Sequence, residues 1–334
     1  MFTKTISTIF AFSLLFVGCQ QKNRFHLDSF KQSVEVKINR FDLDFIALDT
    51  TDVASGLIIL ENKFPAFTSF FLSDVLLMQM TDTVENANQI KAFLQDTTFI
   101  GVHQQVKSIF NDVKEIEKQL SIAFSYLRNY FPEIKLPEIY FFVSGFNQQF
   151  LLNDSILGIG SDLYLGSDFP LYKDITYEYL LPGMRKEMIV SEGLSILLHK
   201  KFPFIGDVNL LNTMIYEGKI CYLMEVLMPD AKTDFILGYT EAEIRWCKQH
   251  EKAIWTSMLE QKHLYSTDYM LINQYINPAP FTSPVSNESP GRLGTWVGYQ
   301  IVAGYMQNNK QIGLAELIQN ENYQSILEQS LYRP

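Results

Sequence analysis

Two serines and two glutamates occupy positions at which a zinc peptidase carries its metal ligands and its catalytic base. Ser191, Glu192 and Ser195 stand at the H, E and H positions of the HExxH pattern. In that pattern, histidines four residues apart on one helix face bind zinc, and the glutamate activates water. Glu217, further along the chain, stands where a third, glutamate ligand is expected. A serine hydroxyl binds zinc poorly at neutral pH because it must first lose a proton, so the sequence predicts no metal and no cofactor here.

Other patterns with chemical meaning are missing from the sequence. None of the five histidines lies four residues from another, and there is no CxxC, GxSxG, P-loop or dinucleotide-binding pattern. Each histidine is therefore expected to be a surface or core residue. Cys221 and Cys247 lie in apolar helical contexts, as two buried thiols or as a disulfide pair, and the sequence leaves both readings open.

A proline-rich string near the carboxyl end provides the candidate binding residues. They are Asn277, Pro278, Pro280, Phe281, Asn287, Glu288, Ser289, Pro290, Gly291 and Arg292. Ser289 is predicted to cap a helix whose first residue is Pro290. Arg292 would then lie near the start of that helix, where the helix dipole disfavours a cation, so a carboxylate partner such as Glu288 is expected. This pair is either a buried structural salt bridge or part of a binding site.

Two glycines in the same region predict a close helix contact. Gly294 and Gly298 are four residues apart and therefore share one face of the predicted helix. Each costs about 1 kcal/mol of helix propensity relative to alanine. We expect the close approach of a neighbouring helix to offset that cost.

Hydrophobic spacing indicates the elements that position these residues. Helices are expected over residues 69–80, 88–94, 102–130 and 188–195, with another opening at residues 216–218. Strands are expected over residues 34–38 and 139–143, and as a hairpin over residues 149–159 with its turn at Asn153 and Asp154. The prediction is an α+β fold, predominantly helical, with a small sheet before the central helix. Because no repeat or long linker interrupts it, residues 34–334 are predicted to form a single domain.

The composition limits the classes of function. Of the 334 residues, 47% are hydrophobic, 14% aromatic and 19% charged, and the formal net charge is −10. These values exclude a disordered chain and predict a large core rich in aromatic rings. The acidic balance lacks the basic footprint of nucleic-acid binding, so no nucleic-acid partner is expected.

The amino-terminal residues predict a signal peptide and a lipid anchor. Lys4 precedes an apolar run that is roughly half as long as a bilayer-spanning helix needs to be. Residues 16–19, Phe-Val-Gly-Cys, resemble a bacterial lipobox, in which the cysteine is acylated. We therefore expect residues 1–18 to be a cleaved signal peptide, Cys19 to insert its acyl chains into a bilayer, and residues 19–33 to be a tether. The predicted location is the cell envelope, membrane-anchored and facing the periplasm.

Strings spread over nearly the whole chain resemble the gliding-motility lipoproteins of the GldB type, which occur in the envelope of gliding Bacteroidetes. They lie at residues 40–42, 130–132, 157–166, 214–219, 238–240, 265–268, 277–281 and 287–294. The resemblance implies a GldB-like domain over residues 34–334, a role in gliding motility and the linked secretion machinery, and envelope proteins of that machinery as partners. The family looks distantly similar to predicted zinc-dependent peptidases, which implies a zincin-like scaffold lacking the metal ligands.

Two hypotheses about function follow. In the first, the protein is a non-catalytic binding or assembly component anchored in the envelope. In the second, it is an envelope hydrolase that uses Glu192 and Glu217 together with His199.

Overall fold

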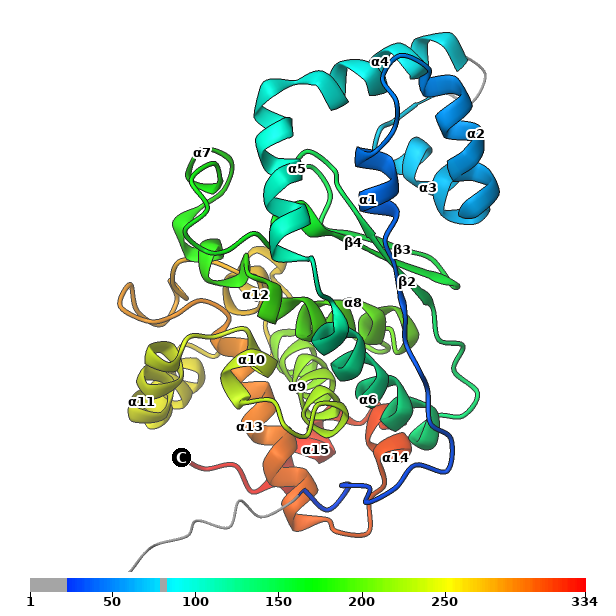
Figure 1. Ribbon diagram of the computed structural model, residues 1–334. Coiled ribbons are helices and arrows are strands. Elements are labelled where there is room, and N and C mark those ends of the chain that lie inside the picture. Colours follow the sequence, from blue (N-terminus) through cyan, green and yellow to red (C-terminus); the bar gives the residue numbers. More distant parts are fainter. Residues whose placement is uncertain (1–22, 79–82) are drawn as a thin grey trace, which may run out of the picture.

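The structure, a computed structural model, describes residues 23–78 and 83–334, where helices predominate around one four-stranded sheet (Figure 1). The strands are β1 (Ile38–Asn39), β2 (Glu138–Phe142), β3 (Phe150–Leu152) and β4 (Ile156–Gly160). The helices are α1 (Phe41–Ile46), α2 (Val53–Lys63), α3 (Pro65–Asp74), α4 (Thr83–Gln95), α5 (Thr97–Ile109), α6 (Lys114–Tyr130), α7 (Tyr172–Ile175), α8 (Ile189–Lys201), α9 (Leu210–Leu227), α10 (Thr233–Leu237), α11 (Glu241–Glu260), α12 (Tyr269–Ile276), α13 (Leu293–Asn308), α14 (Leu314–Gln319) and α15 (Tyr323–Ser330). Short 3₁₀ helices are η1 (Ser161–Leu163), η2 (Glu178–Gly183) and η3 (Lys186–Met188). This confirms the predicted, mostly helical α+β class.

The sheet has the strand order β1-β2-β4-β3. Strand β2 pairs in parallel with both β1 and β4, and β3 pairs with β4 as an antiparallel hairpin. The side chain of Asn153 closes the hairpin turn by accepting hydrogen bonds from the backbone N–H groups of Ser155 and Ile156, both at 2.9 Å. The predicted hairpin and its turn are therefore confirmed.

The strand predicted over residues 34–38 is reduced to the two residues of β1, because helix α6 takes over its hydrogen bonds. The N–H groups of Val34 and Val36 donate to the hydroxyl groups of Ser125 and Ser121, each at 2.9 Å. The N–H of Ile38 donates to the carboxylate of Glu117 at 3.0 Å. The three acceptors are spaced four residues apart along one face of α6, so side chains replace a neighbouring strand.

Aromatic rings join one face of the sheet to the helices at the top of Figure 1. The ring of Phe67 on α3 lies parallel to that of Tyr140 on β2, with centroids 4.3 Å apart. Phe71 contacts Phe142 on the same strand, and Phe41 on α1 packs against Phe67. This packing confirms the expectation of a ring-rich core.

The string at residues 40–42 fixes the start of α1. Arg40 donates two hydrogen bonds to the fully buried carboxylate of Asp42, at 2.9 and 2.8 Å, and a third to the carbonyl of Phe110 at 2.5 Å. These bonds join the first helix to the end of α5, so the string has a structural role.

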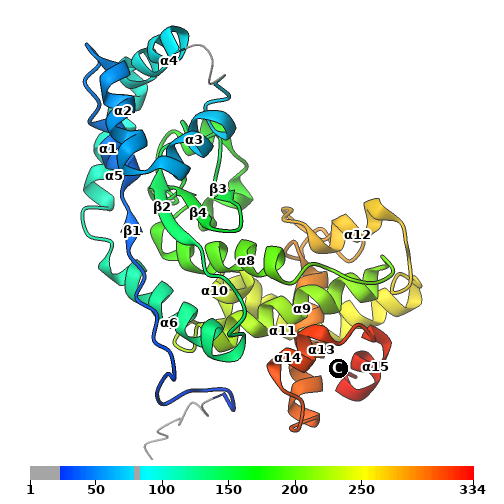
Figure 2. The ribbon, with the colours of Figure 1, turned by 90° about the vertical axis from the view of Figure 1, so that its right-hand side faces the viewer.

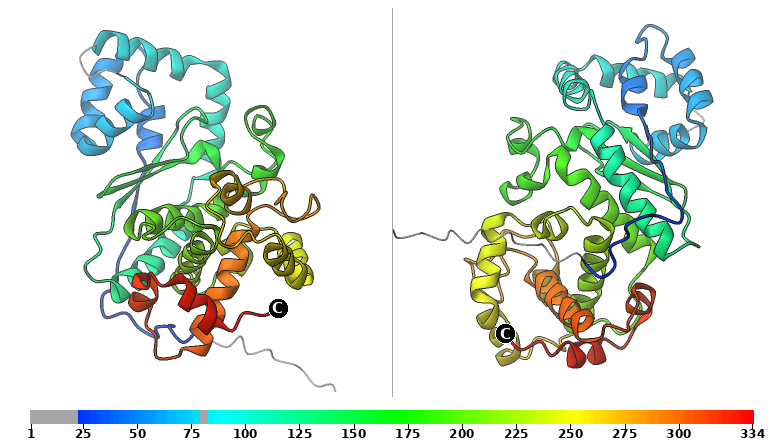
Figure 3. Two further views of the ribbon diagram at one scale, coloured as in Figure 1. Left: turned by 180° about the vertical axis from the view of Figure 1, so that it is seen from behind. Right: turned by 60° about the horizontal axis from the view of Figure 1, so that its bottom comes forward.

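Helix α8 lies against the opposite face of the sheet, as the view from behind in Figure 3 shows. Gly193 is the contact point, since a Cβ atom there would lie 3.7 Å from the side chain of Leu157 and 4.0 Å from that of Ile159, both on β4. The sheet is thus sandwiched between the α1–α3 helices and α8.

Helices α9 and α13 cross with their backbones in contact. A Cβ atom on Gly298 would lie 1.7 Å from the carbonyl oxygen of Met214, and one on Gly218 would lie 2.2 Å from the carbonyl oxygen of Gly298. Gly294 similarly lies against the backbone of Tyr275 on α12. The predicted close helix packing at Gly294 and Gly298 is confirmed, and Gly218 completes it from the partner helix.

The amino-terminal segment packs against the body from Asn23 onward, along the length of α6 (Figure 2). The guanidinium of Arg24 donates to the carbonyl groups of Lys310 and Ile312, beyond the end of α13. The ring of Phe25 contacts that of Tyr130 on α6. Most of the segment predicted as a tether, residues 19–33, is therefore part of the folded body. The predicted signal peptide and Cys19 lie outside the described residues.

Two helix starts differ from the prediction. Asn209 caps α9 by accepting a hydrogen bond from the N–H of Asn212 at 2.9 Å, so residues 216–218 lie in the middle of that helix. Helix α13 begins at Leu293, because Ser289 and Pro290 instead bind Thr282. The N–H of Thr282 contacts the Ser289 hydroxyl at 3.0 Å, and its hydroxyl donates to the Pro290 carbonyl at 2.9 Å. The expected helix over residues 102–130 is divided into α5 and α6.

Cys221 and Cys247 are both buried free thiols, and burial raises the pKa of each to about 12. Of the two readings that the sequence left open, the structure has the unpaired one. Within residues 23–78 and 83–334, no helix combines the length and the apolar composition needed to cross a membrane.

We expect Gly298→Ala to destabilise the fold by about 3 kcal/mol or more, because overpacking a tight contact forces the two helix backbones apart. Urea unfolding followed by circular dichroism measures the change. The matched control is Gly101→Ala on α5, where nothing lies within 4 Å of the added Cβ. That variant should be as stable as the parent or up to about 1 kcal/mol more stable, from helix propensity. Equal stability of the two variants would contradict the close crossing.

Candidate functional site

A cavity of about 580 Å³ brings together several of the residues that the sequence singled out. Helices α8, α9 and α12, the sheet end and the start of α13 surround it. Its polar lining includes Gln149, Glu192, Ser195, His199, Glu217 and Arg292. Its apolar lining includes Phe146, Phe150, Leu163, Ile175, Met184 and Ile276. The volume lies within the range of about 300–1,000 Å³ typical of small-molecule sites.

One face of α8 points toward this cavity. Glu192, Ser195, Ile196 and His199 line it, at the spacing of three, four and seven residues that shares a helix face. Ser191 is buried away from it and donates its hydroxyl hydrogen to the carbonyl of Met188 at 3.1 Å. The two serines of the degenerate HExxH pattern therefore do not face one site together, and a histidine one turn beyond Ser195 enters the cavity instead.

Glu192 is held by two neutral donors. Its Oε2 atom accepts hydrogen bonds from the Tyr164 hydroxyl at 2.6 Å and from the Gln149 amide at 2.8 Å. No donor among the described residues bonds to Oε1. Burial raises the pKa of Glu192 to about 7, although the Tyr164 hydrogen bond and the charge of Arg292 lower it. Near neutral pH this carboxyl group is therefore divided between its protonated and ionised forms.

His199 and Glu217 are paired with each other through their side chains. The Nε2 atom of His199 lies 3.2 Å from each carboxylate oxygen of Glu217, and its Nδ1 atom lies 2.7 Å from the carbonyl oxygen of Ser195. Burial lowers the pKa of His199, but its bonds to Glu217 and Ser195 outweigh burial and raise the pKa overall. In the protonated imidazolium both nitrogens donate to these acceptors, so neither has a lone pair free to bind a metal or accept a proton. The described residues hold no group of three or more His, Cys, Asp or Glu side chains arranged for a metal ion.

Arg292 brings a positive charge to the cavity lining. It has a left-handed backbone conformation, with φ at 59°, immediately before α13. Its Nη1 atom donates to the carbonyl of Leu237 at 2.9 Å, and the guanidinium takes part in none of the ion pairs of the described residues. The expected pairing with Glu288 is wrong, because Glu288 lies on the exposed part of the 282–290 loop, whose fold is closed by Thr282 and Ser289.

Some other residues of the proline-rich string line the cavity, and the rest lie outside it. Asn277 and Pro278 line the cavity with Arg292. Gly291 lies against the backbone of Ala279, where a Cβ atom would come within 2.2 Å of the carbonyl oxygen. The residues of the string outside the lining are Pro280, Phe281, Asn287, Glu288, Ser289, Pro290 and Gly291.

Sequence reasoning missed Tyr164 and Gln149, the two partners of Glu192. Tyr164 lies in one of the distinctive strings, which was its only signal, and Gln149 had none. Both reach Glu192 only because the β3–β4 hairpin and the following turn lie over α8.

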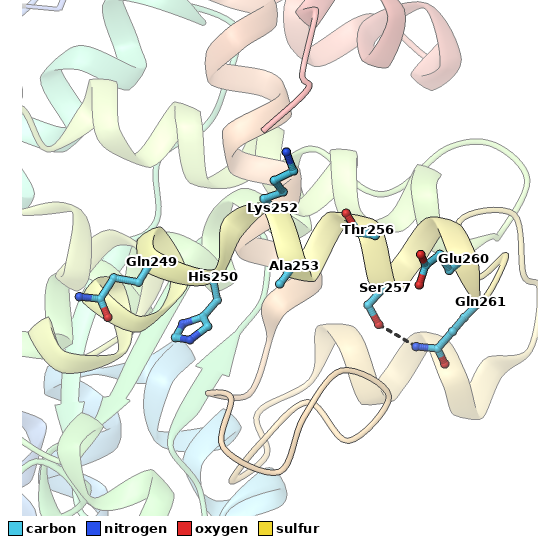
Figure 4. A pocket seen from close by; sticks show the side chains of 8 residues that line it. All are labelled: Gln249, His250, Lys252, Ala253, Thr256, Ser257, Glu260 and Gln261. Carbon is cyan, nitrogen blue, oxygen red and sulfur yellow. Dashed lines mark hydrogen bonds between the residues drawn. The ribbon is translucent and has the colours of Figure 1, made fainter.

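A second hollow, on α11, is less suited to binding. Figure 4 shows its lining side chains spread along this one helix, and none of them converges on a common point. The ring of His250 stacks on that of Trp246, with centroids 4.2 Å apart, and the side chain of Gln261 donates to the Ser257 hydroxyl at 2.7 Å. The side chain of Gln261 also donates to the carbonyl of Pro284, and that of His250 bonds to the carbonyl of Trp246, so both already have partners and we assign no site here.

The fold and the cavity define a mostly helical α+β protein whose ligand-sized site lies between a small sheet and a crossed helix pair. The family model described as "Gliding motility protein GldB" matches residues 22–334, so the chain belongs to this family. The family name fits a membrane-anchored envelope protein with a role in gliding. No curated protein and no solved structure matches the chain.

We expect a carboxyl group to titrate near pH 7 in the folded protein, and this signal to vanish in Glu192→Gln. The hydrogen bond from Tyr164 lowers the pKa of Glu192. Tyr164→Phe removes that bond and should therefore move the midpoint upward. The raised pKa also predicts a change of stability with pH. Between pH 4.5 and about 7, the unfolded chain has released the proton of Glu192 and the folded chain retains it. The parent should therefore lose stability relative to Glu192→Gln as the pH rises through this range. Infrared carboxyl bands measure the titration. Glu260→Gln, on the exposed face of α11, serves as the control, and a midpoint near 4.5 in the parent would refute the burial argument.

Proposed function

We propose that the protein is a lipid-anchored component of the cell envelope that supports gliding and the linked secretion machinery by binding, without catalysis. The observation that carries this proposal is the pairing of His199 with Glu217. The imidazole that a hydrolase needs as base or metal ligand is committed to a neighbouring carboxylate and a backbone carbonyl. Among the described residues, the polar groups left open in the cavity include one carboxylate oxygen of Glu192 and the guanidinium of Arg292, which suit recognition.

A zincin-like scaffold that lacks its metal ligands is part of this proposal. It is supported by the position of α8 directly under the sheet and by Glu217 on the adjacent α9.

A hydrolase is the second candidate, and one observation favours it. A carboxyl group with a pKa near 7 and an open oxygen in a cavity suits general acid–base chemistry. Such an enzyme would use Glu192 as its proton carrier, with Glu217 and His199 as supporting residues.

Complementation in cells separates the two candidates. In a strain lacking this protein, Glu192→Gln should restore gliding speed to within about tenfold of the parent, the cost of at most one lost ligand hydrogen bond, whereas removing a general acid–base group typically costs roughly 10²–10⁴-fold in rate. The glutamine keeps an oxygen that accepts from Tyr164. Glu217→Gln should behave in the same way, provided that immunoblots show normal protein levels.

Loss of gliding in both variants, with folding preserved, would favour the hydrolase. Purified protein should contain no stoichiometric zinc by elemental analysis and should cleave no generic peptide. One tightly held zinc per chain would overturn the binding proposal.

The docked amino-terminal segment also predicts how the protein stands on the membrane. The chain from Cys19 to Asn23 spans at most about 14 Å when extended. Because Arg24 is bonded beside Lys310, acyl chains on Cys19 would hold the turn between α13 and α14 close to the bilayer. Helix α2 lies at the opposite end of the molecule (Figure 1).

A spin label at Lys310→Cys should therefore respond to a membrane-bound relaxation agent in vesicles, and one at Ile59→Cys on α2 should not. Ile59 is 67% exposed, so a label there is accessible to solvent. A Cys19→Ala chain should remain unbound to vesicles and serves as the control. Equal responses at the two positions would contradict the proposed orientation.

A further inference from the structure

The cavity contains one positive charge that no carboxylate of the described residues contacts. Glu217 is paired with His199, and Glu192 shares its charge with a proton near neutral pH. Arg292 uses one nitrogen on the carbonyl of Leu237, and its other donors have no partner among the described residues. A partly buried guanidinium in this state has lost part of its hydration without a carboxylate in return, so an anionic ligand would stabilise it.

The cavity wall is largely apolar around this charge. Aromatic and aliphatic side chains from several separate elements, including Phe146, Phe150, Leu163, Ile175 and Ile276, form most of the surface. Burial of an apolar group against them would provide affinity, and the charge would fix the orientation.

The remaining polar groups suit a ligand that contains amides. Oε1 of Glu192 is an open acceptor, and the side chains of Thr176 and Asn277 at the cavity lining have no hydrogen bond to the described residues. These groups offer both donors and acceptors, as a peptide backbone requires.

We propose that this cavity binds the carboxylate end of an apolar chain, with the guanidinium of Arg292 receiving the carboxylate and the ring-lined wall receiving the apolar side chains. The inference rests on the proposed binding function and specifies its ligand class. Peptide carboxyl termini and fatty acids share this chemistry, and the amide groups at the lining favour the peptide.

The test uses the full acylated chain in lipid nanodiscs and small water-soluble probes. N-acetyl-leucyl-leucine should bind at least about tenfold more tightly than its carboxamide, which keeps the same apolar body without the charge; a tenfold ratio corresponds to about 1.4 kcal/mol. Octanoate and octanamide form the second pair, and tighter binding of octanoate than of the peptide would assign the site to fatty acids. Isothermal titration calorimetry measures all four affinities.

Variants locate the carboxylate. Arg292→Gln should abolish the preference for the acid over the amide, and Arg292→Lys should retain part of it, because a lysine keeps the charge but loses the bidentate geometry. Arg245→Gln, on the exposed face of α11, is the matched control and should leave the preference unchanged. Circular dichroism checks that each variant folds, and the acid–amide comparison on the unaltered protein tests the proposal without any variant.

An independent readout is the titration of Glu192. A bound carboxylate neutralises Arg292, whose charge lowers the pKa of Glu192, so the midpoint should rise on binding of the acid and stay constant with the amide. Equal affinities for acid and amide, or a preference for the cation leucinamide over both, would overturn the proposal. Cleavage of the bound peptide would instead uphold the ligand class while refuting the non-catalytic function.

Discussion

The close crossing of α9 and α13 is the contact on which the rest of the structure depends. Gly218 and Gly298 have no side chains at the crossing, so the two backbones touch. Glu217 precedes one of these glycines, and Arg292 lies immediately before α13. The same contact that packs the core therefore sets the distance between the two charged walls of the cavity. A bulkier residue at the crossing would change the cavity as well as the stability.

The two cavity glutamates differ because of what faces them. Glu217 meets an imidazole whose pKa it raises, so this pair favours opposite charges that balance each other inside the protein. Glu192 meets a phenol and an amide, which hydrogen-bond to it without offsetting the cost of burying its charge. The carboxylate of Glu217 is thus held by His199, whereas the protonation of Glu192 still responds to pH and to ligands.

Much of the architecture could be predicted from local patterns. The hairpin over residues 149–159 was predictable because Asn153, within the turn, closes it. The close packing of α13 was predictable because Gly294 and Gly298 are four residues apart in the sequence. Where the prediction from sequence was wrong, a residue distant in the chain forms the hydrogen bond that the local pattern had assigned to a near neighbour. Ser289 prefers to cap a helix, but Thr282 occupies its hydroxyl, so the helix begins after Arg292. Residues 34–38 alternate like a strand, yet α6 supplies their acceptors.

The amino-acid sequence by itself determined the family, the mostly helical class with its small sheet, and the residue types available at the site, because these follow from composition, period and strings that are local in the chain. Only the tertiary structure decided that His199 faces the cavity and Ser191 does not, and that Tyr164 and Gln149 hold Glu192. It also decided that Arg292 has no carboxylate partner in the described chain. The physical reason is that burial, hydrogen bonding and charge compensation are set by neighbours in space, and in this protein those neighbours come from segments far apart in the sequence.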